Sequence, residues 1–542
     1  MNKPARRGPS PRRDIYTIIT LTALIGTLIF RIPLGYMIGD RGMACFGMAN
    51  EIYLALAGAF SYGLSEAAAL LVRYRIKREQ FKSAQKVLRG GLFIGGITGT
   101  ALSLLFLFSG HGIAGNVMHL PLAGLCVRLM APSMVFNILT GVFRGYFKGN
   151  GSRVPEMHSQ ILHTVFLFTG GLIGAGLLVK YGDKVSALLQ NADYTGAYGA
   201  MGASIGLLTA SVFCFLHALA LFFIFRNNIK RQMGREMQKN TDTNLRIFYL
   251  LAGTGGLYTL LWFCFQSLPL IDQYLFFTSA RETGNMAGQW GTYYGKCLVV
   301  IGILCAVIDM ICLHPIRRIL VSLERDGQKI AGGRLGTLIH QCAVLAIPAA
   351  VFLAVLGENL LDMLFKGSNR QAAGWLQIGS LIIVFSVFGT VFMEILLKGR
   401  RMKYVAAVGA GALILHIITA EVLLRTTSLG IMAVLIAVIV FYAAVSGAGF
   451  FLVSGMFQYR QEWIKTFAIT IVAAAVSGGI AMLLNKLLAS LLGAGITLLV
   501  VVPVCAVIFL ILLIVTRAFD RQEMEEMTGG RILIMLAGLL RQ

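Results

Sequence analysis

Charged side chains are scarce in this sequence of 542 residues. Asp, Glu, Lys and Arg together make up 13% of it, which is about half of the roughly 25% that is usual in soluble domains. Hydrophobic residues make up 57%. A chain with so little charge lacks the polar surface that a soluble fold of this length requires, so the composition excludes an ordinary water-soluble protein.

Acidic residues are the scarcer of the two charged classes. The sequence has 24 Asp and Glu against 47 Lys and Arg, a formal net charge of +23. A basic excess of this size is typical either of nucleic-acid binding or of the cytoplasmic loops of a membrane protein. The positions of the basic residues along the chain decide between the two.

Patterns for enzymatic chemistry and metal binding are also missing. The nine cysteines are scattered and form no CxxC pair, which leaves no pattern for a zinc site, a cluster or a disulfide framework. The sequence has neither a GxxxxGK[ST] phosphate loop nor an HExxH motif. Its longest polar segments have about twenty residues, too few for a catalytic domain. We therefore expect no enzymatic activity, no cofactor and no metal.

What the sequence does contain is a series of long apolar runs. Each exceeds the roughly 18 residues that indicate a membrane span. The runs are continuous rather than alternating, which favours helices, since a helix satisfies its own backbone groups in lipid. We predict an all-α polytopic membrane protein with about fourteen transmembrane helices. The predicted spans are 15–38, 44–72, 88–110, 120–143, 156–179, 197–225, 246–268, 285–313, 335–356, 374–397, 403–424, 429–455, 464–487 and 491–516.

The basic residues gather in alternate loops. If fourteen helices alternate in direction, 36 of the 47 Lys and Arg fall on one side of the membrane. The positive-inside rule then places both termini in the cytoplasm. This bias explains the net charge without nucleic acid. It predicts a multi-pass protein of the bacterial cytoplasmic membrane whose basic clusters contact anionic membrane lipids.

The span order predicts two halves. Each half has six spans and begins in the cytoplasm, so the halves would be parallel repeats, that is, two six-helix bundles, followed by two extra C-terminal helices. The predicted segments are a basic N-terminus (1–13), a first bundle (14–226), a linker (227–245), a second bundle (246–456), the extra helices (457–516) and a C-terminal tail (517–542).

A few charged residues lie inside the predicted spans, where each is costly unless it is paired or hydrated. At 1.5 Å per helical residue, Arg31, Arg128 and Lys296 share roughly one depth in the outer part of the bilayer, and Arg281 lies just before the eighth span. These four bases predict a substrate cavity that binds an anion. Alternatively they only fix helix packing. The candidate charge partners are Glu51 for Arg31, and Asp272 for Lys296 or Arg281.

Other polar residues in the apolar runs have simpler interpretations. Glu394 and Glu421 each have a basic residue four positions later, Lys398 and Arg425 respectively. This spacing predicts local ion pairs on one helix face. Histidines such as His163 share no ligand spacing, so we interpret them as hydrogen-bonded core residues.

Three motifs resemble one known family. The segment FRIPLGYMIGDRG (30–42) resembles the first-helix signature of the stage V sporulation protein B type of polysaccharide transporter, in the multidrug/oligosaccharidyl-lipid/polysaccharide (MOP) flippase superfamily. The segment GVFRGYFKGNGSRVPEMHSQ (141–160) is similar to the fourth loop of that family, and FDRQEMEEMTGGRILIMLAGLL (519–540) to its C-terminal segment. The motifs occur in family order along nearly the whole chain.

The resemblance implies a function as well as a fold. Members of the family fold as two six-helix bundles around a central cavity, and relatives flip lipid-linked sugars, including the peptidoglycan precursor. Arg31 falls in the matching RIPL motif, where cavity arginines hold the pyrophosphate. The expected substrate is a prenyl-diphosphate-linked oligo- or polysaccharide precursor for the cell envelope or spore wall, moved by alternating access. A cation-coupled multidrug exporter is the second interpretation, and a non-transporting scaffold in envelope or spore assembly is the third.

Overall fold

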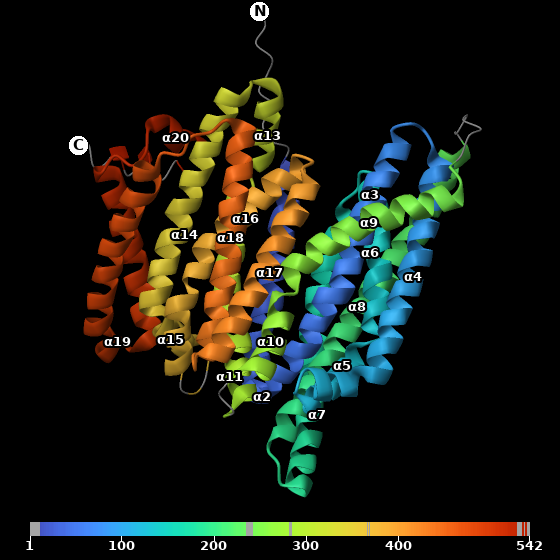
Figure 1. Ribbon diagram of the computed structural model, residues 1–542, viewed down its shortest axis with the longest axis horizontal. Coiled ribbons are helices and arrows are strands. Elements are labelled where there is room, and N and C mark those ends of the chain that lie inside the picture. Colours follow the sequence, from blue (N-terminus) through green and yellow to red (C-terminus); the bar gives the residue numbers. More distant parts are fainter. Residues whose placement is uncertain are drawn as a thin grey trace, which may run out of the picture. The chain divides into compact units, whose positions relative to one another are not determined.

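The computed structural model describes residues 11–234, 242–280, 284–365 and 369–527, with isolated positions between and after these ranges. Within them the chain is helical and has no strand (Figure 1). Several predicted features lie wholly or partly outside the described residues. They are most of the N-terminal segment 1–13, the middle of the linker 227–245, Arg281 and parts of the tail 517–542.

The chain divides into two compact units, Met1–Gly295 and Lys296–Gln542. The elements that belong to unit 1 are α1 (Pro11–Ile29), α2 (Arg31–Ile52), η1 (Tyr53–Gly58), α3 (Ala59–Ile76), α4 (Phe81–Gly112), η2 (Ile113–Val117), η3 (Pro121–Ala123), α5 (Gly124–Met130), α6 (Ser133–Gly149), α7 (Val154–Leu189), α8 (Asp193–Gly234), α9 (Asn244–Gln266), α10 (Leu268–Ser279) and α11 (Met286–Thr292). The boundary between the units falls in the π-helical segment η4 (Tyr293–Cys297).

Unit 2 contains the remaining elements. They are α12 (Leu298–Cys312), α13 (Ile316–Arg325), α14 (Gln328–Leu364), α15 (Arg370–Gly379), α16 (Leu381–Lys398), α17 (Met402–Thr426), α18 (Ile431–Phe457), η5 (Ile464–Ala468), α19 (Ile469–Val515) and α20 (Arg521–Glu526). The borders predicted at 226 and 246 follow span order rather than packing, and they stay predictions.

The number of spans agrees with the sequence. Twelve helices of the described chain are long and apolar enough to cross a membrane, or thirteen when the bent pair Pro121–Met130 and Ser133–Gly149 counts as one span. The first of the twelve, Ile18–Ile76, has 59 residues, about 88 Å of helix, and Gly39 interrupts it with a φ of +66°. That segment therefore contains two spans, and the prediction of an all-α polytopic protein with about fourteen helices is confirmed.

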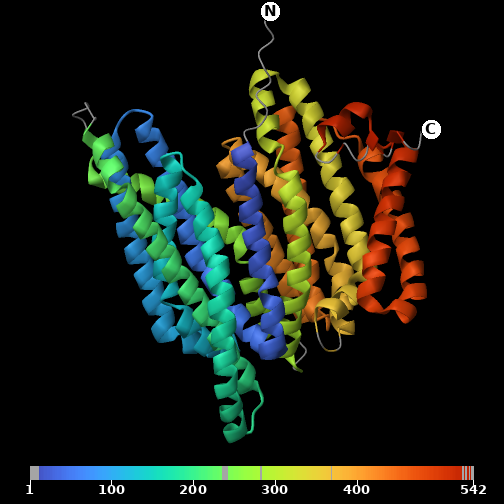
Figure 2. The same ribbon diagram turned by 180° about the vertical axis from the view of Figure 1, so that it is seen from behind.

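Glycines bring helices α7 and α8 into close contact. An added Cβ at Gly174 would lie 2.4 Å from the carbonyl oxygen of Gly202, and one at Gly206 would lie 2.6 Å from the Cα of Gly171. These two helices form the long teal and green hairpin of unit 1 (Figure 2). Small residues permit such approach between membrane helices, which associate mainly through tight packing rather than through the hydrophobic effect.

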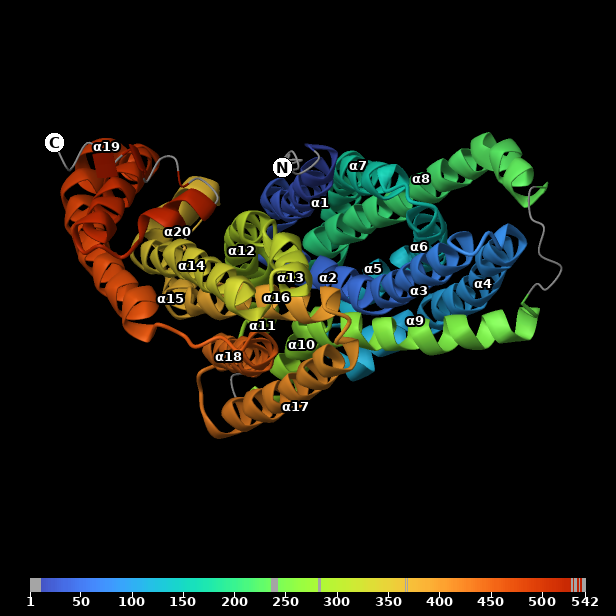
Figure 3. The ribbon, with the colours of Figure 1, turned by 90° about the horizontal axis from the view of Figure 1, so that it is seen from above.

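Helix α9 packs along α3 and α4 inside unit 1 (Figure 3). Gly63 of α3 faces the backbone of α9, and the ring of Tyr62 lies 4.8 Å from that of Trp262. The indole N–H of Trp262 donates to the carbonyl oxygen of Leu54 at 3.3 Å. The first helix of the predicted second bundle is thus attached to α3 along much of its length.

The start of α9 is held by a buried arginine. Arg75, at the end of α3, donates from Nε and Nη2 to one carboxylate oxygen of Asp242 at 3.0 and 2.7 Å. The backbone of Asp242 also binds α4, where its N–H donates to Ser83 and its carbonyl oxygen accepts from Lys86. Asp242 therefore connects α3, α4 and the beginning of α9 at one end of the unit.

Helix α20 packs on the rest of unit 2. Asp520 caps α20, and Lys465 contacts the carboxylates of Asp520 at 2.8 Å and Glu523 at 3.0 Å. Burial alone would raise the pKa of Glu523, but hydrogen bonds from His340, from the backbone of Asp520 and from Lys465 outweigh it and lower the pKa to about 2. Glu523 is therefore ionised at physiological pH and keeps this contact.

The contact between α3 and α9 predicts a specific sensitivity to substitution. An added Cβ at Gly63 would lie 2.0 Å from Thr259 Oγ1 and 2.6 Å from the carbonyl oxygen of Gly255. We expect Gly63→Ala to lower stability by about 1–3 kcal/mol, because a backbone atom cannot move aside without separating the helices. The measurement is the thermal unfolding midpoint of the purified protein in detergent.

The matched control for Gly63→Ala lies on α9 itself. Gly256 has no atom within 4 Å of an added Cβ, so Gly256→Ala should leave the midpoint unchanged or raise it slightly, since alanine favours a helix. Equal midpoints for the two variants would show that α9 does not pack against α3 as described.

Candidate functional site

Arg31 lies at a break in the first span. Helix α1 ends at Ile29 and α2 begins at Arg31. Pro33 has no N–H to donate to the carbonyl oxygen of Ile29, so the hydrogen-bond ladder is interrupted at this point. The interruption places Arg31 at the junction of two helical segments, where its side chain is buried with about 10% of its surface exposed.

Four side chains form one polar network around Arg31. They are Arg31, Asn50, Glu51 and Tyr294, all buried in unit 1. Arg31 Nη2 lies 3.4 Å from Glu51 Oε1. The same oxygen accepts from the hydroxyl of Tyr294 at 2.8 Å and from the amide of Asn50 at 3.1 Å. We call this group the Arg31 network.

The two carboxylate oxygens of Glu51 differ in the number of hydrogen bonds that they accept. Its Oε1 receives three donors, whereas its Oε2 is buried and has no hydrogen-bond partner among the described residues. The 3.4 Å contact to Arg31 is longer than the 2.7–2.9 Å that is usual for charge-assisted bonds. Glu51 therefore compensates the charge of Arg31 without engaging the whole guanidinium.

Tyr294 completes the network from a distant part of the sequence. The Cζ atom of Arg31 lies 4.0 Å from the centroid of the Tyr294 ring, a cation–π contact. An added Cβ at Gly47 would lie 2.9 Å from Tyr294 Cδ1, so only glycine leaves room for the ring. Tyr294 belongs to η4, and Glu51 lies just before η1. Both η1 and η4 are π-helical, a distortion that is frequent at functional sites.

The other predicted bases do not join the Arg31 network. Arg128 is exposed on unit 1, and its Nε donates to the carbonyl oxygen of Leu107 at 3.0 Å. Lys296 belongs to unit 2 and is buried there; its ammonium group donates to Asn369 Oδ1 at 3.1 Å. Asn369 in turn donates to Asp362 at 3.0 Å. The roles of Arg128 and Lys296 in substrate binding stay predictions.

The remaining candidates are Arg281 and Asp272. Arg281 lies outside the described residues. Asp272 is buried in α10 of unit 1 with 1% of its surface exposed. Its predicted pairing with Lys296 or Arg281 stays a prediction, as does the role of Arg281 in the cavity.

Sequence reasoning missed three functional candidates. Asn50 and Tyr294 are neutral, so a search for intramembrane charges passes over them. Arg144 was assigned to the loop 144–153 because the predicted span ended at 143. This assignment is wrong, since α6 continues to Gly149 and Arg144 lies inside it. The aromatic residues Tyr146 and Phe147, both buried, were the available signal that the helix continues.

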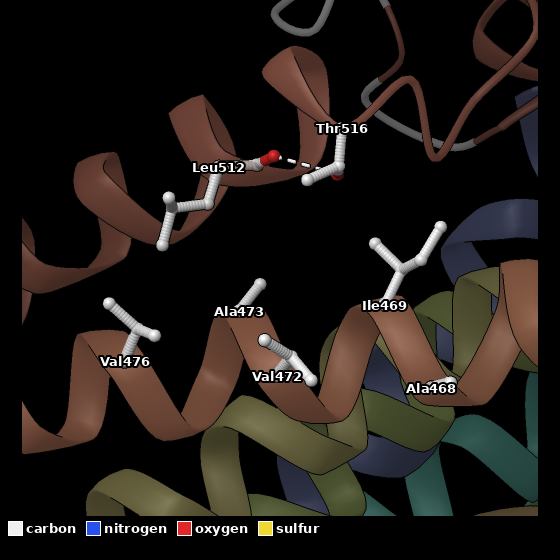
Figure 4. A pocket seen from close by; sticks show the side chains of 7 residues that line it. All are labelled: Ala468, Ile469, Val472, Ala473, Val476, Leu512 and Thr516. Carbon is white, nitrogen blue, oxygen red and sulfur yellow. Dashed lines mark hydrogen bonds between the residues drawn. The ribbon is translucent and has the colours of Figure 1, made fainter.

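Helix α19 is two helical segments joined at Gly493, which has a φ of +74°. An apolar pocket lies between these two segments in unit 2 (Figure 4). Its volume is about 260 Å³, and its lining residues are Ala468, Ile469, Val472, Ala473, Val476, Leu512 and Thr516. The hydroxyl of Thr516 donates to the carbonyl oxygen of Leu512 at 2.8 Å, so the one polar side chain is satisfied. A pocket without charge offers nothing to a phosphate, and the Arg31 network remains the candidate site.

The Arg31–Glu51 pair predicts a non-additive response to mutation. Glu51→Gln keeps an oxygen for Tyr294 and Asn50 but leaves Arg31 without a counter-charge, so it should cost about 3–5 kcal/mol. Adding Arg31→Met removes the uncompensated charge, and the double variant should recover a large part of this loss. The measurement is a thermal unfolding cycle of the four proteins in detergent. Additive losses would show that the two side chains do not interact.

Known proteins resemble this chain in sequence and in fold, although no family model matches it. The chain is similar to stage V sporulation protein B of Bacillus subtilis (strain 168), with 20% identity over 525 residues, covering 95% of this chain and 96% of that protein. The resemblance that the sequence motifs suggested is thereby confirmed over nearly the whole length of the chain.

Solved structures of transporters share the fold. An inward-facing multidrug resistance MATE family transporter of the MOP superfamily matches with a TM-score of 0.56 and 13% identity, covering 82% of this chain and 98% of that one. A eukaryotic MATE transporter gives a TM-score of 0.55 at 14% identity, over 82% and 95% of the two chains. A MOP superfamily transporter from Pyrococcus furiosus gives 0.53 at 13%, over 82% and 95%.

The fold and the sequence comparison agree on the kind of protein. The chain is a multi-pass membrane protein with the fold of the MOP superfamily transporters, and it resembles stage V sporulation protein B from end to end.

Proposed function

We propose that this protein is a flippase or exporter of a prenyl-diphosphate-linked sugar precursor, working by alternating access. The similarity to stage V sporulation protein B over 95% of the chain supports a role in envelope or spore-wall assembly. The transporter fold supports movement of a substrate rather than its chemical conversion. The charge of the site is informative, because a reverse polarity of the binding pocket suggests a different function for the P. furiosus transporter.

The single observation that carries the proposal is that the guanidinium of Arg31 has donors that no carboxylate occupies. Only its Nη2 contacts a carboxylate in the described part of the chain, and the side chain keeps about 10% of its surface exposed. A guanidinium has five N–H donors in a fixed fork that matches phosphate oxygens. Nε and Nη1 thus remain available to bind one phosphate of a diphosphate.

Glu51 then acts as the counter-charge of the empty site. It compensates Arg31 while no substrate is bound, and the long 3.4 Å contact is weak enough for a phosphate to replace. Asn50 and Tyr294 hold the carboxylate in place during the exchange, because both donate to its Oε1. In this arrangement Glu51 positions Arg31 and need not touch the substrate.

The second candidate is a cation-coupled exporter. It is favoured by the orphan Oε2 of Glu51, a buried acceptor that a proton or a cation would satisfy. An exporter of organic cations would use Glu51 as its binding group and Arg31 as the positioning residue. The two candidates therefore assign opposite roles to the same ion pair.

A transport assay separates the two candidates. We expect the reconstituted wild-type protein to move a fluorescent prenyl-diphosphate sugar analogue, and Arg31→Gln to reduce the rate at least tenfold while the protein remains folded and inserted. Arg425→Gln, which removes an exposed arginine paired locally with Glu421, is the matched control and should keep the wild-type rate. Transport of an organic cation that depends on Glu51, with no diphosphate transport, would support the exporter instead.

The membrane orientation is part of the same proposal. We place the protein in the bacterial cytoplasmic membrane with both termini inside, on the asymmetry of the Lys and Arg residues. Single cysteines at Gln80 and Gln328 should react with an impermeant thiol reagent only from the cytoplasmic side, and one at Asn191 only from outside. The nine native cysteines are buried or half-buried, which keeps background labelling low. Labelling of any of the three positions from the opposite side contradicts the orientation.

A further inference from the structure

Arg144 is a second arginine in the interior of unit 1. It lies on α6, and its Nη2 donates to the hydroxyl of Ser61 on α3 at 2.8 Å. The hydroxyl of Ser61 in turn donates a hydrogen bond to the carbonyl oxygen of Asn137 at 2.9 Å. The side chain is half-buried, and its Nε is buried without a hydrogen-bond partner among the described residues.

The surroundings of Arg144 are polar but neutral. Tyr53 of η1, His163 of α7 and Cys214 of α8 lie within electrostatic range of its charge. The hydroxyl of Tyr53 shares a hydrogen bond with Ser211 at 2.8 Å, and the Tyr53 ring stacks on His163 with centroids 6.5 Å apart. None of these side chains is a carboxylate.

The missing counter-charge distinguishes Arg144 from its neighbours. Arg31 has Glu51, and Lys148, one turn after Arg144 on α6, pairs with both Glu66 and Glu156. In the described part of the chain no Asp or Glu forms an ion pair with Arg144. A charge among membrane helices costs free energy unless a counter-charge or water compensates it, so the spare donors of Arg144 favour the binding of an anion.

We propose that Arg144 is the centre of a second oxyanion site inside unit 1, which binds a phosphate group. The unpaired donor at this site is Nε of Arg144, and the half-buried amide of Asn137, whose two oxygens accept from Ser61, lies beside it. The guanidinium fork and an amide donor suit the several oxygens of a phosphate better than a spherical anion. The phosphate belongs either to the lipid-linked substrate or to a membrane phospholipid.

The site is separate from the Arg31 network but lies on the same helical segment. Glu51 of that network and Ser61, which holds Arg144, are ten residues apart on α2–η1–α3, about 15 Å along a helix. If the substrate diphosphate is the ligand, unit 1 has two phosphate-binding sites, one at Arg31 and one at Arg144, at different depths. If a phospholipid is the ligand, Arg144 anchors the bundle to one leaflet.

The test measures phosphate binding without Arg31. In purified Arg31→Gln protein in detergent, inorganic pyrophosphate at constant ionic strength should still raise the thermal unfolding midpoint, because a ligand that binds only the folded state stabilises it. Arg31→Gln/Arg144→Gln should show no such shift. Arg31→Gln/Arg425→Gln is the matched control and should keep it. Because Arg31 is absent throughout, the outcome is independent of the proposed function, which the transport assay tests.

A second arm identifies the source of the phosphate. The same three proteins are placed in nanodiscs of phosphatidylcholine with and without phosphatidylglycerol. Stabilisation by pyrophosphate that depends on Arg144 supports a site open to a diphosphate substrate, and stabilisation by phosphatidylglycerol alone that depends on Arg144 supports a lipid headgroup site. If neither ligand gives a shift that depends on Arg144, the proposal is overturned.

Two further variants test the proposal in case the Arg144→Gln protein folds poorly. Arg144→Lys keeps the charge but loses the fork, and Ser61→Ala frees Nη2 from the oxygen that orients it. In the Arg31→Gln background, each should weaken pyrophosphate or phosphatidylglycerol binding roughly tenfold, the loss of about one oriented charge-assisted bond. Unchanged affinity in both variants would overturn the assignment.

Discussion

A charge inside a bundle of membrane helices must be compensated by the protein, because the lipid around it offers neither water nor counter-ions. Most buried bases of this chain follow that constraint. Arg75 takes the carboxylate of Asp242, Arg31 takes that of Glu51, and Lys296 reaches Asp362 through the amide of Asn369. The first and third of these contacts join segments that are distant in sequence, 167 residues apart for Arg75 and Asp242 and 73 for Lys296 and Asn369, so the placement of charge also determines which helices associate.

Arg144 departs from this pattern, because no described carboxylate compensates its charge. The sequence suggested several bases facing one cavity with a surplus of positive charge. In unit 1 the conspicuous base, Arg31, forms part of a neutral pair, whereas Arg144 has no acid beside it in the described residues. An arginine without an acidic partner among the described residues therefore occupies a position that hydropathy had assigned to a loop.

The sequence was sufficient wherever one local property determined the result. Continuous apolar runs gave the helical class and the number of spans, since a helix in lipid depends only on its own residues. Spacing by four gave the ion pairs Glu394–Lys398, at 2.9 Å, and Glu421–Arg425. The Arg31–Glu51 contact also followed from local information, because depth along two consecutive spans places the two residues near each other.

Features that depend on distant parts of the chain were beyond such reasoning. Tyr294 donates to Glu51 across 243 residues, and no periodicity in either helix indicates that contact. The exposure of Arg128 depends on which face of its helix packs inward, and depth alone does not determine it.

The π-helical segment η1 separates the two basic groups of unit 1, with Glu51 before it and Ser61 after it. A π-turn accommodates one residue more than an α-turn, so its hydrogen-bond register differs by one from that of the helix on either side. One residue corresponds to about 100° of rotation in an α-helix. If η1 relaxed to α-helical register, the face that carries Ser61 would turn by about 100° relative to Glu51. Arg144 would then lose the hydroxyl of Ser61 as its partner and face a different side chain of α3. A change of one residue in the hydrogen-bond register of η1 would therefore alter the contacts of Arg144 while leaving those of Arg31 in place.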